Sequence, residues 1–421
     1  MSTDVTGNRS SLIDVCSNEG VGRKIKVAIV VSHPIQHFVH FYRALAARNE
    51  LSIKVFFCSR IGVDEYFDKN MGVVIRWAGD MTGGFDHEFL PEASGIKNTR
   101  FRSINNPSIG AALRAFEPDV VMIYGFAQAT PLRALAWCRV NGIPVLMTTD
   151  SNFVTKRPFH KRLLRQTMLR LLLSQVSGFL TVGDQNEDAL EELGVPRTKM
   201  YRTPFTIDEQ RYRRARAERA ELRVQIRERY GIAREAFLGI AVGKLIPRKR
   251  TQDAVMAFAE VAKTDGDVNA HLLVCGNGPD AEQIEAHVKT GAPVTMAGFV
   301  NIDELPNHFA AADVLVHPSG QDPHPLICSE AACIGLPMIL SDRVGTIGPT
   351  DISRRDENAL VYPCGDVKIL ADRIFDLAVD RHALEEMSAA SLRIYEECSL
   401  AVSVDGFLRA VNGVASKVAC Q

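Results

Sequence analysis

The sequence predicts an α/β protein with two doubly wound parallel sheets in tandem. Short apolar runs rich in β-branched residues alternate with helical patterns, which is typical of parallel βαβ construction. The alternation stops once, at a highly charged segment, and then restarts. A chain of 421 residues, 46% of them hydrophobic, is also long enough to bury two cores.

The first series of runs predicts the strands of an N-terminal domain, which we assign to residues 23–205. Residues 1–22 before it are polar and are expected to be disordered. The expected strands lie within residues 25–34, 52–59, 119–126, 143–151, 177–184 and 199–205.

The second series predicts a C-terminal domain, which we assign to residues 206–399. Its first part, residues 208–236, is highly charged and helix-forming, as expected of a solvated element beside a linker. The expected strands follow within residues 237–245, 270–278, 293–300, 312–319, 336–342 and 358–363. Sheets of this kind bind ligands beyond the carboxyl ends of their strands, so two facing domains predict a site in the cleft between them.

Composition excludes several classes of protein. The net charge of −1 provides no basic field for nucleic acid, so any anionic ligand must be held locally. The nine cysteines form no CxxC pair or dense disulfide pattern, which indicates reduced thiols in the cytoplasm. The sequence shows neither the apolar core of a signal peptide nor a run approaching ~18 apolar residues, so we expect neither secretion nor a membrane span.

A strand end and a basic turn in the second half suggest an anion site. Gly243 and Lys244 follow the run at 237–245, and Lys249 and Arg250 come just before a helix expected to start near Thr251. Cations and helix-terminal amides at strand ends are the usual partners of phosphate. A solvated basic turn is the alternative.

A G-x-G pair, Gly276 and Gly278, lies between the next strand and its helix. Gly276 is a candidate for binding, although glycines at such turns often serve only the backbone. The full G-x-G-x-x-G pattern and the Walker lysine pattern are both missing, so neither a nicotinamide site nor a P-loop is predicted.

Two carboxylates lie close to the start of the helix expected to begin near Pro325. The first amides of that helix, around His324, Pro325 and Leu326, are free to bind a diphosphate. Glu330, about one turn into the helix, can accept both hydroxyls of a ribose. Asp322, on the preceding loop, would reach another group such as a sugar hydroxyl.

The first half contributes candidates for the opposite side of the cleft. His33, His37 and His40 hint at a metal, but Pro34 and the lack of a nearby acidic ligand argue against one, so no metal is predicted. We expect His33 and His37 to line the cleft and His40 to be a solvated or packed helix residue. Asp150 ends an inner strand and is a candidate acceptor contact or base; a turn or helix-cap acid is the alternative.

A basic, leucine-rich segment follows Asp150. No acid occurs between Asp150 and Asp184, while the lysines and arginines of residues 156–170 are interleaved with leucines. Such a segment can lie on an anionic membrane surface and meet a lipid-linked acceptor. An ordinary helix that packs its leucines inward is the alternative.

Several ordered motifs resemble one known family. "SGQDPHPLICSEAACIGLPMILSD" resembles the donor-site signature of retaining GT-B glycosyltransferases of the family 4 type (group 1), E-x7-E followed by A-x-A-x-G-x-P, with Asp322 as the first acid. "VGKLIPRKR" is similar to the family's strand and turn with two cations, although Lys244 stands where arginine is more usual. The resemblance is strong over roughly 237–400 and looser in the first half, where "SHPIQHFVHFYRALA" is similar to the loop and helix after the family's first strand.

The resemblance implies a GT-B fold of two Rossmann-like domains, with a C-terminal helix at about 400–421 packing back on the first. It implies sugar transfer from a nucleotide-diphosphate sugar to a glycan, lipid-linked or small-molecule acceptor, with retention of configuration and without a metal or other cofactor. Lys244 and Lys249 would neutralise the diphosphate, while Glu330 would hold the ribose and Asp322 the donor sugar. A catalytically silent scaffold and a sugar-nucleotide epimerase remain alternatives. We expect a cytoplasmic protein, peripheral at the inner membrane face if residues 156–170 contact lipid.

Overall fold

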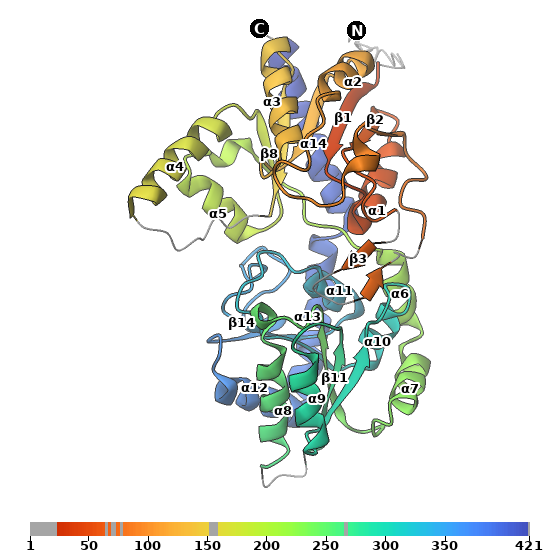
Figure 1. Ribbon diagram of the computed structural model, residues 1–421. Helices are drawn as coiled ribbons and strands as arrows, with labels where there is room; N and C mark the ends of the chain where they lie inside the picture. Colours follow the sequence, from red (N-terminus) through yellow and green to blue (C-terminus); the bar gives the residue numbers. More distant parts are fainter. Residues whose placement is uncertain are drawn as a thin grey trace, which may run out of the picture.

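A computed structural model of the chain describes residues 23–63, 66–68, 73–75, 79–150, 159–264 and 268–419. The segment 1–22 expected to be disordered lies outside these residues. Two α/β domains lie one above the other, each around a parallel sheet (Figure 1). The predicted fold class is therefore confirmed.

The N-terminal sheet has seven parallel strands, and each predicted run contains one of them. Along β1, Val27 and Ile29 face one core while Ala28 and Val30 face the other, because successive side chains alternate across a sheet that helices cover on both sides. The additional strand β5 and the antiparallel pair β3–β4 were not predicted. The sheet order is β5 (His87–Phe89), β2 (Leu51–Phe57), β1 (Ile25–Val31), β6 (Val120–Tyr124), β7 (Val145–Thr149), β8 (Gly178–Thr181) and β9 (Met200–Arg202), and the pair is β3 (Tyr66–Asp68) and β4 (Val73–Ile75). The helices are α1 (Gln36–Ala46), α2 (Ile109–Phe116), α3 (Ala129–Asn141), α4 (Phe159–Leu173) and α5 (Asp184–Glu192), with short 3-10 turns at Ala93–Gly95 and Arg197–Lys199.

The C-terminal sheet has six parallel strands, again one in each predicted run. Leu238 and Ile240 of its central strand enter one core, and Phe237 and Ala241 the other. The sheet order is β12 (Val294–Gly298), β11 (Ala270–Cys275), β10 (Phe237–Val242), β13 (Val314–His317), β14 (Met338–Ser341) and β15 (Ala359–Tyr362). Its helices are α8 (Thr251–Val261), α9 (Ala281–Lys289), α10 (Leu305–Ala311), α11 (Leu326–Ile334), α12 (Val367–Val379) and α13 (Arg381–Glu397).

The charged segment at 208–236 forms two helices, α6 (Glu209–Ala217) and α7 (Arg219–Arg229). The expectation of a merely solvated element is wrong for one face, because Tyr212 and Ile226 belong to the core of the C-terminal domain. Arg227 is only 1% exposed and pairs with Asp313 at 2.9 Å. The high average charge of the segment concealed this narrow apolar stripe.

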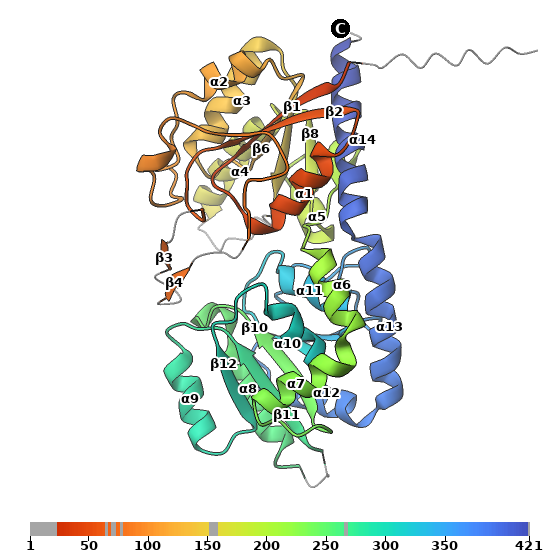
Figure 2. The ribbon, with the colours of Figure 1, turned by 90° about the vertical axis from the view of Figure 1, so that its right-hand side faces the viewer.

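The chain crosses between the domains twice, once before α6 and once between α13 and α14 (Leu400–Ala419). Helices α13 and α14 run along one side of the molecule, and Phe407 of α14 enters the core of the N-terminal domain (Figure 2). One carboxylate oxygen, Glu209 Oε1, accepts hydrogen bonds from the Tyr395 hydroxyl at 2.9 Å and the Leu400 amide at 2.6 Å. Glu209 therefore connects the two chain segments that run from one domain to the other. None of the described helices combines the length and apolar character needed to cross a membrane.

Candidate active site

The carboxyl ends of the two sheets face each other across the domain interface. The ring of Phe205, in the short linker between β9 and α6, lies 5.4 Å from the ring of His324. Asp150 follows β7, and part of its side chain is exposed to the cleft. The surrounding protein removes some of its water, and the negative charge of Asp322 lies nearby, so the pKa of Asp150 is raised. The interdomain cleft expected from the sequence is therefore present, with Asp150 and Asp322 on opposite sides.

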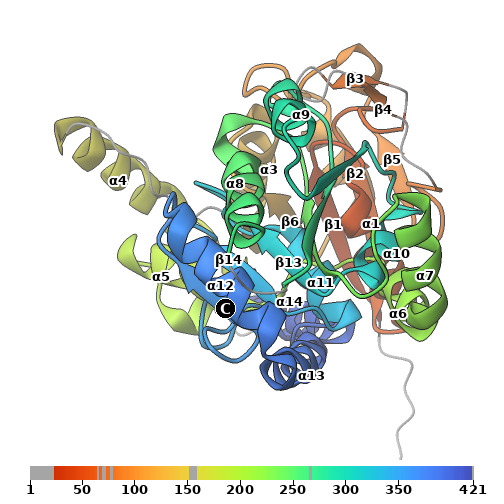
Figure 3. The same ribbon diagram turned by 90° about the horizontal axis from the view of Figure 1, so that it is seen from below.

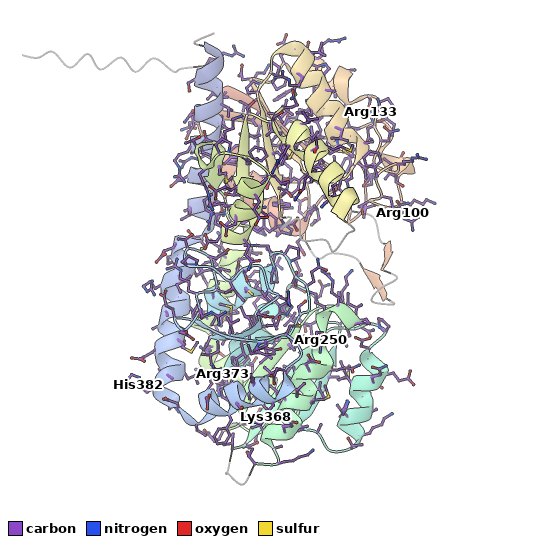
Figure 4. The ribbon with its side chains drawn as sticks, turned by 90° about the vertical axis from the view of Figure 1, so that its left-hand side faces the viewer. Arg100, Arg133, Arg250, Lys368, Arg373 and His382 are labelled. Atoms are coloured by element: carbon purple, nitrogen blue, oxygen red, sulfur yellow. The ribbon has the colours of Figure 1, made fainter. Side chains whose placement is uncertain are left out.

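Hydrogen bonds to backbone carbonyls join the basic turn after β10 to the loop after β13. The amide of Gly320 donates to the carbonyl of Arg248 at 2.8 Å, and the Arg248 guanidinium donates to the carbonyl of Gln321 at 2.9 Å. Figure 4 shows Arg250 of this turn nearer to the N-terminal domain than Lys368. The two hydrogen bonds of Arg248 bring the neighbouring residue Lys249 next to Asp322.

Asp322 is the centre of a buried charged cluster. Its Oδ2 atom accepts a hydrogen bond from His317 Nε2 at 2.9 Å and forms an ion pair with Lys249 Nζ. Burial alone would raise the pKa of Asp322, but the His317 hydrogen bond and the Lys249 charge lower it to about 2. Asp322 is therefore ionised at neutral pH. His317, the last residue of β13, was missed by sequence reasoning, and its place at a strand end was the signal available.

The two G-x-G glycines allow two strand ends to approach closely. A Cβ atom on Gly276 would lie 1.9 Å from the carbonyl oxygen of Gly243, and one on Gly278 would lie 2.3 Å from that of Leu245. Gly243 itself has φ +138° at the end of β10, and Lys244 follows it there. Packing thus accounts for Gly276 and Gly278, and the binding role of Gly276 stays a prediction.

Helix α11 begins at Leu326, as expected, and Pro325 at its N-cap supplies no side-chain cap. Its first amides are therefore available to an anion from the cleft. His324, just before it, is buried, and burial with the nearby positive charge of Arg202 lowers its pKa to about 4. The ring beside these amides is consequently neutral.

Glu330 lies one turn into α11 and faces a pocket that is partly open to solvent. We call it the linker pocket; its lining includes Gln36, His37, Arg211, Tyr212, Ile302 and Glu330. The Oε2 atom of Glu330 is shielded from solvent and has no hydrogen-bond partner. Burial raises the pKa of Glu330 to about 7 against the opposing effect of the Tyr212 hydroxyl.

Burial keeps the first two histidines after β1, His33 and His37, uncharged. His33 Nδ1 lies 2.8 Å from Ser32 Oγ, and burial lowers the pKa of His33 to about 4. His37 packs on Phe205 with ring centroids 5.3 Å apart, and burial, His324 and His33 lower its pKa to about 3. His40 Nε2 lies 3.5 Å from Asp208. Within the described residues, no group of three or more His, Cys, Asp or Glu side chains is arranged to hold a metal.

A second group of polar residues joins the domains away from these histidines. We call Asp184, Arg202, Thr350 and Asp351 the interdomain clasp. Asp184 accepts from the Thr350 amide at 2.8 Å, from the Thr350 hydroxyl at 2.5 Å and from Arg202 at 2.5 Å. Asp351 accepts from the Asp184 amide at 2.9 Å, and burial raises its pKa to about 7. No local pattern around these four residues predicted the clasp.

The basic segment 156–170 is only partly described, because Lys156 and Arg157 lie outside the described residues. Helix α4 projects from the body of the molecule (Figure 3). Leu169 and Leu173 are buried, whereas Met168 and Leu171 are 63% and 65% exposed. The alternative of an ordinary helix holds for one face of α4, and the other face presents apolar side chains to solvent.

The chain matches two known families. Residues 34–206 match the glycosyl transferase 4-like domain, and residues 223–393 match the glycosyl transferases group 1.

Curated relatives show partial similarity. The GDP-mannose-dependent alpha-(1-6)-phosphatidylinositol monomannoside mannosyltransferase of Mycobacterium tuberculosis is 31% identical over 206 residues, or 46% of this chain and 51% of the relative. The 2-deoxystreptamine glucosyltransferase of Streptomyces kanamyceticus is 30% identical over 255 residues, or 56% of this chain and 64% of the relative. The chain thus spans about half the length of the first relative and less than two thirds of the second.

Solved structures share the fold. HepE of Anabaena in complex with UDP and glucose superposes with a TM-score of 0.65 at 14% identity, covering 92% of this chain and 99% of HepE. Sucrose-phosphate synthase of Thermosynechococcus elongatus superposes with a TM-score of 0.67 at 16% identity, covering 94% and 100%.

Proposed function

The chain belongs to the group 1 glycosyltransferases of GT-B fold, and from this premise we propose that it transfers a sugar from a nucleoside-diphosphate sugar to an acceptor hydroxyl. We propose further that the anomeric configuration is retained and that no metal ion is required. The observation that carries the proposal is the cluster of Lys249, His317 and Asp322 beside the uncapped start of α11.

The chemistry follows from where charge develops. The bond between the anomeric carbon and the diphosphate oxygen breaks, a new bond forms to the acceptor oxygen, and negative charge gathers on the leaving diphosphate. The region where that charge would lie contains two cations, Lys244 and Lys249, and the first amides of α11, which donate hydrogen bonds. These groups would stabilise the transition state. No cofactor takes part in this step.

The acids would hold the donor. Asp322 keeps its hydrogen bond from His317 at Oδ2 while Lys249 turns to the diphosphate, and the carboxylate can then accept a further hydrogen bond from a hydroxyl of the donor sugar. Glu330 Oε2, which has no partner, would accept from the ribose hydroxyls.

The acceptor would enter from the N-terminal domain. Asp150, His33 and His37 lie there, and the raised pKa of Asp150 favours a role in receiving the acceptor proton. The two relatives act, by their names, on a phosphatidylinositol monomannoside and on 2-deoxystreptamine. Lipid-linked, small-molecule and glycan acceptors all remain within the proposal.

Helix α4 is proposed to touch an anionic membrane surface at the cytoplasmic face. Exposed Met168 and Leu171 beside the basic residues of 156–170 support this contact. Replacing the lysines and arginines of 156–170 with glutamine should reduce sedimentation with vesicles containing phosphatidylglycerol. Lys289→Gln with Lys368→Gln is the matched control, and unchanged sedimentation of the α4 variant would remove the membrane contact from the proposal.

The deciding experiment is a thermal-shift panel of UDP-, GDP-, ADP- and dTDP-sugars, followed by a transfer assay with the sugar that binds. A selective ligand should raise the melting temperature, and Glu330→Ala should lose that shift. Glu285→Ala, at an exposed position on α9, is the control. Absence of any shift would overturn the proposed donor site, and binding without transfer would favour a silent scaffold.

A further inference from the structure

One loop of the C-terminal domain receives polar contacts from the start of α5 in the N-terminal domain. We call residues 343–353, which follow β14, the strap loop. Asp184 accepts hydrogen bonds from the amide and the hydroxyl of Thr350 in this loop. A Cβ atom on Gly348 would lie 2.2 Å from Asp184 Oδ2, so the helix and the strap loop are in close contact. Helix α5 also lies beside the C-terminal domain in two perpendicular views (Figure 1 and Figure 2).

The strap loop is folded as one unit. The amide of Ser353 donates to the carbonyl of Thr346 at 3.1 Å, and the amide of Gly348 donates to the carbonyl of Ser353 at 3.1 Å. The side chains of Val344, Thr346 and Ser353 are buried. Because buried, hydrogen-bonded segments open only at a cost in free energy, a contact at Thr350 also restrains the beginning of the loop.

One peptide group at the beginning of the strap loop is bonded to both domains. The carbonyl of Val344 accepts a long hydrogen bond, at 3.4 Å, from Nε2 of Gln185, the second residue of α5. The amide of Gly345, the other end of the same peptide, donates to the carbonyl of Asp322 at 2.8 Å. Gln185 Nε2 also lies 3.5 Å from the carbonyl oxygen of Ile347. The planar peptide therefore links Gln185 to the backbone of Asp322.

The strap loop also packs directly on the loop that carries Asp322. A Cβ atom on Gly345 would lie 2.0 Å from the carbonyl oxygen of Pro323, so no side chain separates the two loops. The Asp322 carboxylate in turn accepts from His317 Nε2 at 2.9 Å and pairs with Lys249. A shift of the strap loop would therefore move the backbone of Asp322 relative to these two partners.

We propose that Gln185 is a positioning residue for Asp322 and that it acts through the Val344–Gly345 peptide. This inference rests on the proposed function, in which Asp322 accepts from a hydroxyl of the donor sugar. Gln185 belongs to the domain that the acceptor enters, so its contact sets the donor sugar in register with the acceptor. Displacement of a reacting group by about 1 Å can slow a reaction on the order of 10²-fold, which makes even a small shift of Asp322 measurable.

Gln185→Met and Gln185→Lys test the inference, because both keep the length of the side chain and only lysine keeps a donor for the two carbonyls. We expect kcat with the nucleotide sugar that wild type uses to fall about tenfold in Gln185→Met and to recover in Gln185→Lys. The Kd of the matching nucleoside diphosphate, measured by calorimetry, should stay unchanged, because Asp322 is assigned to the sugar. Gln225→Met is the control, since it removes an exposed amide that bonds only within α7.

A double-mutant cycle tests whether Gln185 acts through Asp322. Single-turnover rates, which remain measurable when transfer is slow, are compared for wild type, Gln185→Met, Asp322→Asn and the double variant. Gln185→Met should slow wild type about tenfold but slow Asp322→Asn less than twofold, because its effect is already lost there. A tenfold effect in both backgrounds would overturn the route through Asp322.

The remaining outcomes separate two failures. If wild type transfers no sugar from any UDP-, GDP-, ADP- or dTDP-sugar, the proposed function fails and this inference fails with it. If wild type transfers sugar and Gln185→Met matches it, only the positioning role is overturned. Equal slowing in Gln185→Met and Gln185→Lys would overturn it as well, and so would a loss of nucleoside-diphosphate affinity that accompanies the fall in kcat.

Discussion

The interdomain clasp and the linker pocket lie at the same domain interface, but the polar groups of the clasp have hydrogen-bond partners and several of those in the pocket do not. In the clasp, Asp184 accepts three hydrogen bonds and Asp351 accepts backbone amides, so its charges are paired within the protein. In the linker pocket, Glu330, Arg211 and their neighbours keep atoms without partners. Paired groups contribute to holding the domains together, whereas unpaired ones are available to a ligand. Substitutions at the two places should therefore have different consequences.

The largest effect is expected at the charged cluster around Asp322. Lys249→Ala should reduce transfer by about 10²–10³-fold, because one preorganised charge at the leaving group is lost. Turnover of the donor sugar used by wild type is the measurement, and Lys289→Ala, at an exposed site on α9, should leave it unchanged. Full activity of Lys249→Ala would take Lys249 out of the mechanism.

Breaking the clasp should cost stability more than ligand binding. Asp184→Ala removes the acceptor of three hydrogen bonds and leaves half-buried Arg202 with fewer partners, so the unfolding free energy should fall by about 3 kcal/mol. Urea denaturation measures this loss. Asp188→Ala on the same helix removes a carboxylate that is 65% exposed and should cost much less. Equal losses in the two variants would mean that the clasp stabilises nothing beyond a surface pair.

The buried carboxyl group of Glu330 in the linker pocket should make the free energy of unfolding depend on pH. Because burial raises the pKa of Glu330 to about 7, the folded state holds its proton more tightly than the unfolded state. Stability from this group is complete below the ordinary glutamate pKa and is lost as pH rises through about 7. Glu330→Gln should remove up to roughly 3 kcal/mol of this dependence. Denaturation curves across this pH range that keep the same slope in the variant would contradict the buried, unpaired state of Glu330.

The smallest effect is expected where the linker contacts the N-terminal domain. The Thr206 hydroxyl donates to the carbonyl of His37 at 2.7 Å, so Thr206→Val should cost about 1 kcal/mol of unfolding free energy. Donor binding should change little, because this group is paired like those of the clasp. A large loss of binding with unchanged stability would instead assign Thr206 to the ligand site.

Local pattern predicted the two sheets and most of their strands. Parallel strands buried on both faces appear as continuous apolar runs, so every predicted run contains a strand. The rule that ligands bind beyond carboxyl ends of strands also placed Asp150 and Asp322 at the same cleft. Strand β5 was not predicted, because it is short and because His87 and Glu88 interrupt its apolar character.

Residues that act through long-range contacts left no local signal. Arg211 is one arginine among many in a charged helix, and only the tertiary structure shows its unpaired atom in the linker pocket. Asp184 and Asp351 are far apart in sequence, and nothing in either neighbourhood predicts that they meet. His317 could have been found, since it ends a strand whose loop was already assigned to the site.

The bonds that Glu209 makes at the two crossings also restrict how the domains can move. Two chain segments held side by side act as a pinned axis, because rotation about their common line preserves the Tyr395 and Leu400 hydrogen bonds while sliding would break them. Rotation about this line would still have to break the bonds between Asp184 and Thr350 in the interdomain clasp. One pair of spectroscopic labels placed across the cleft would report such a rotation.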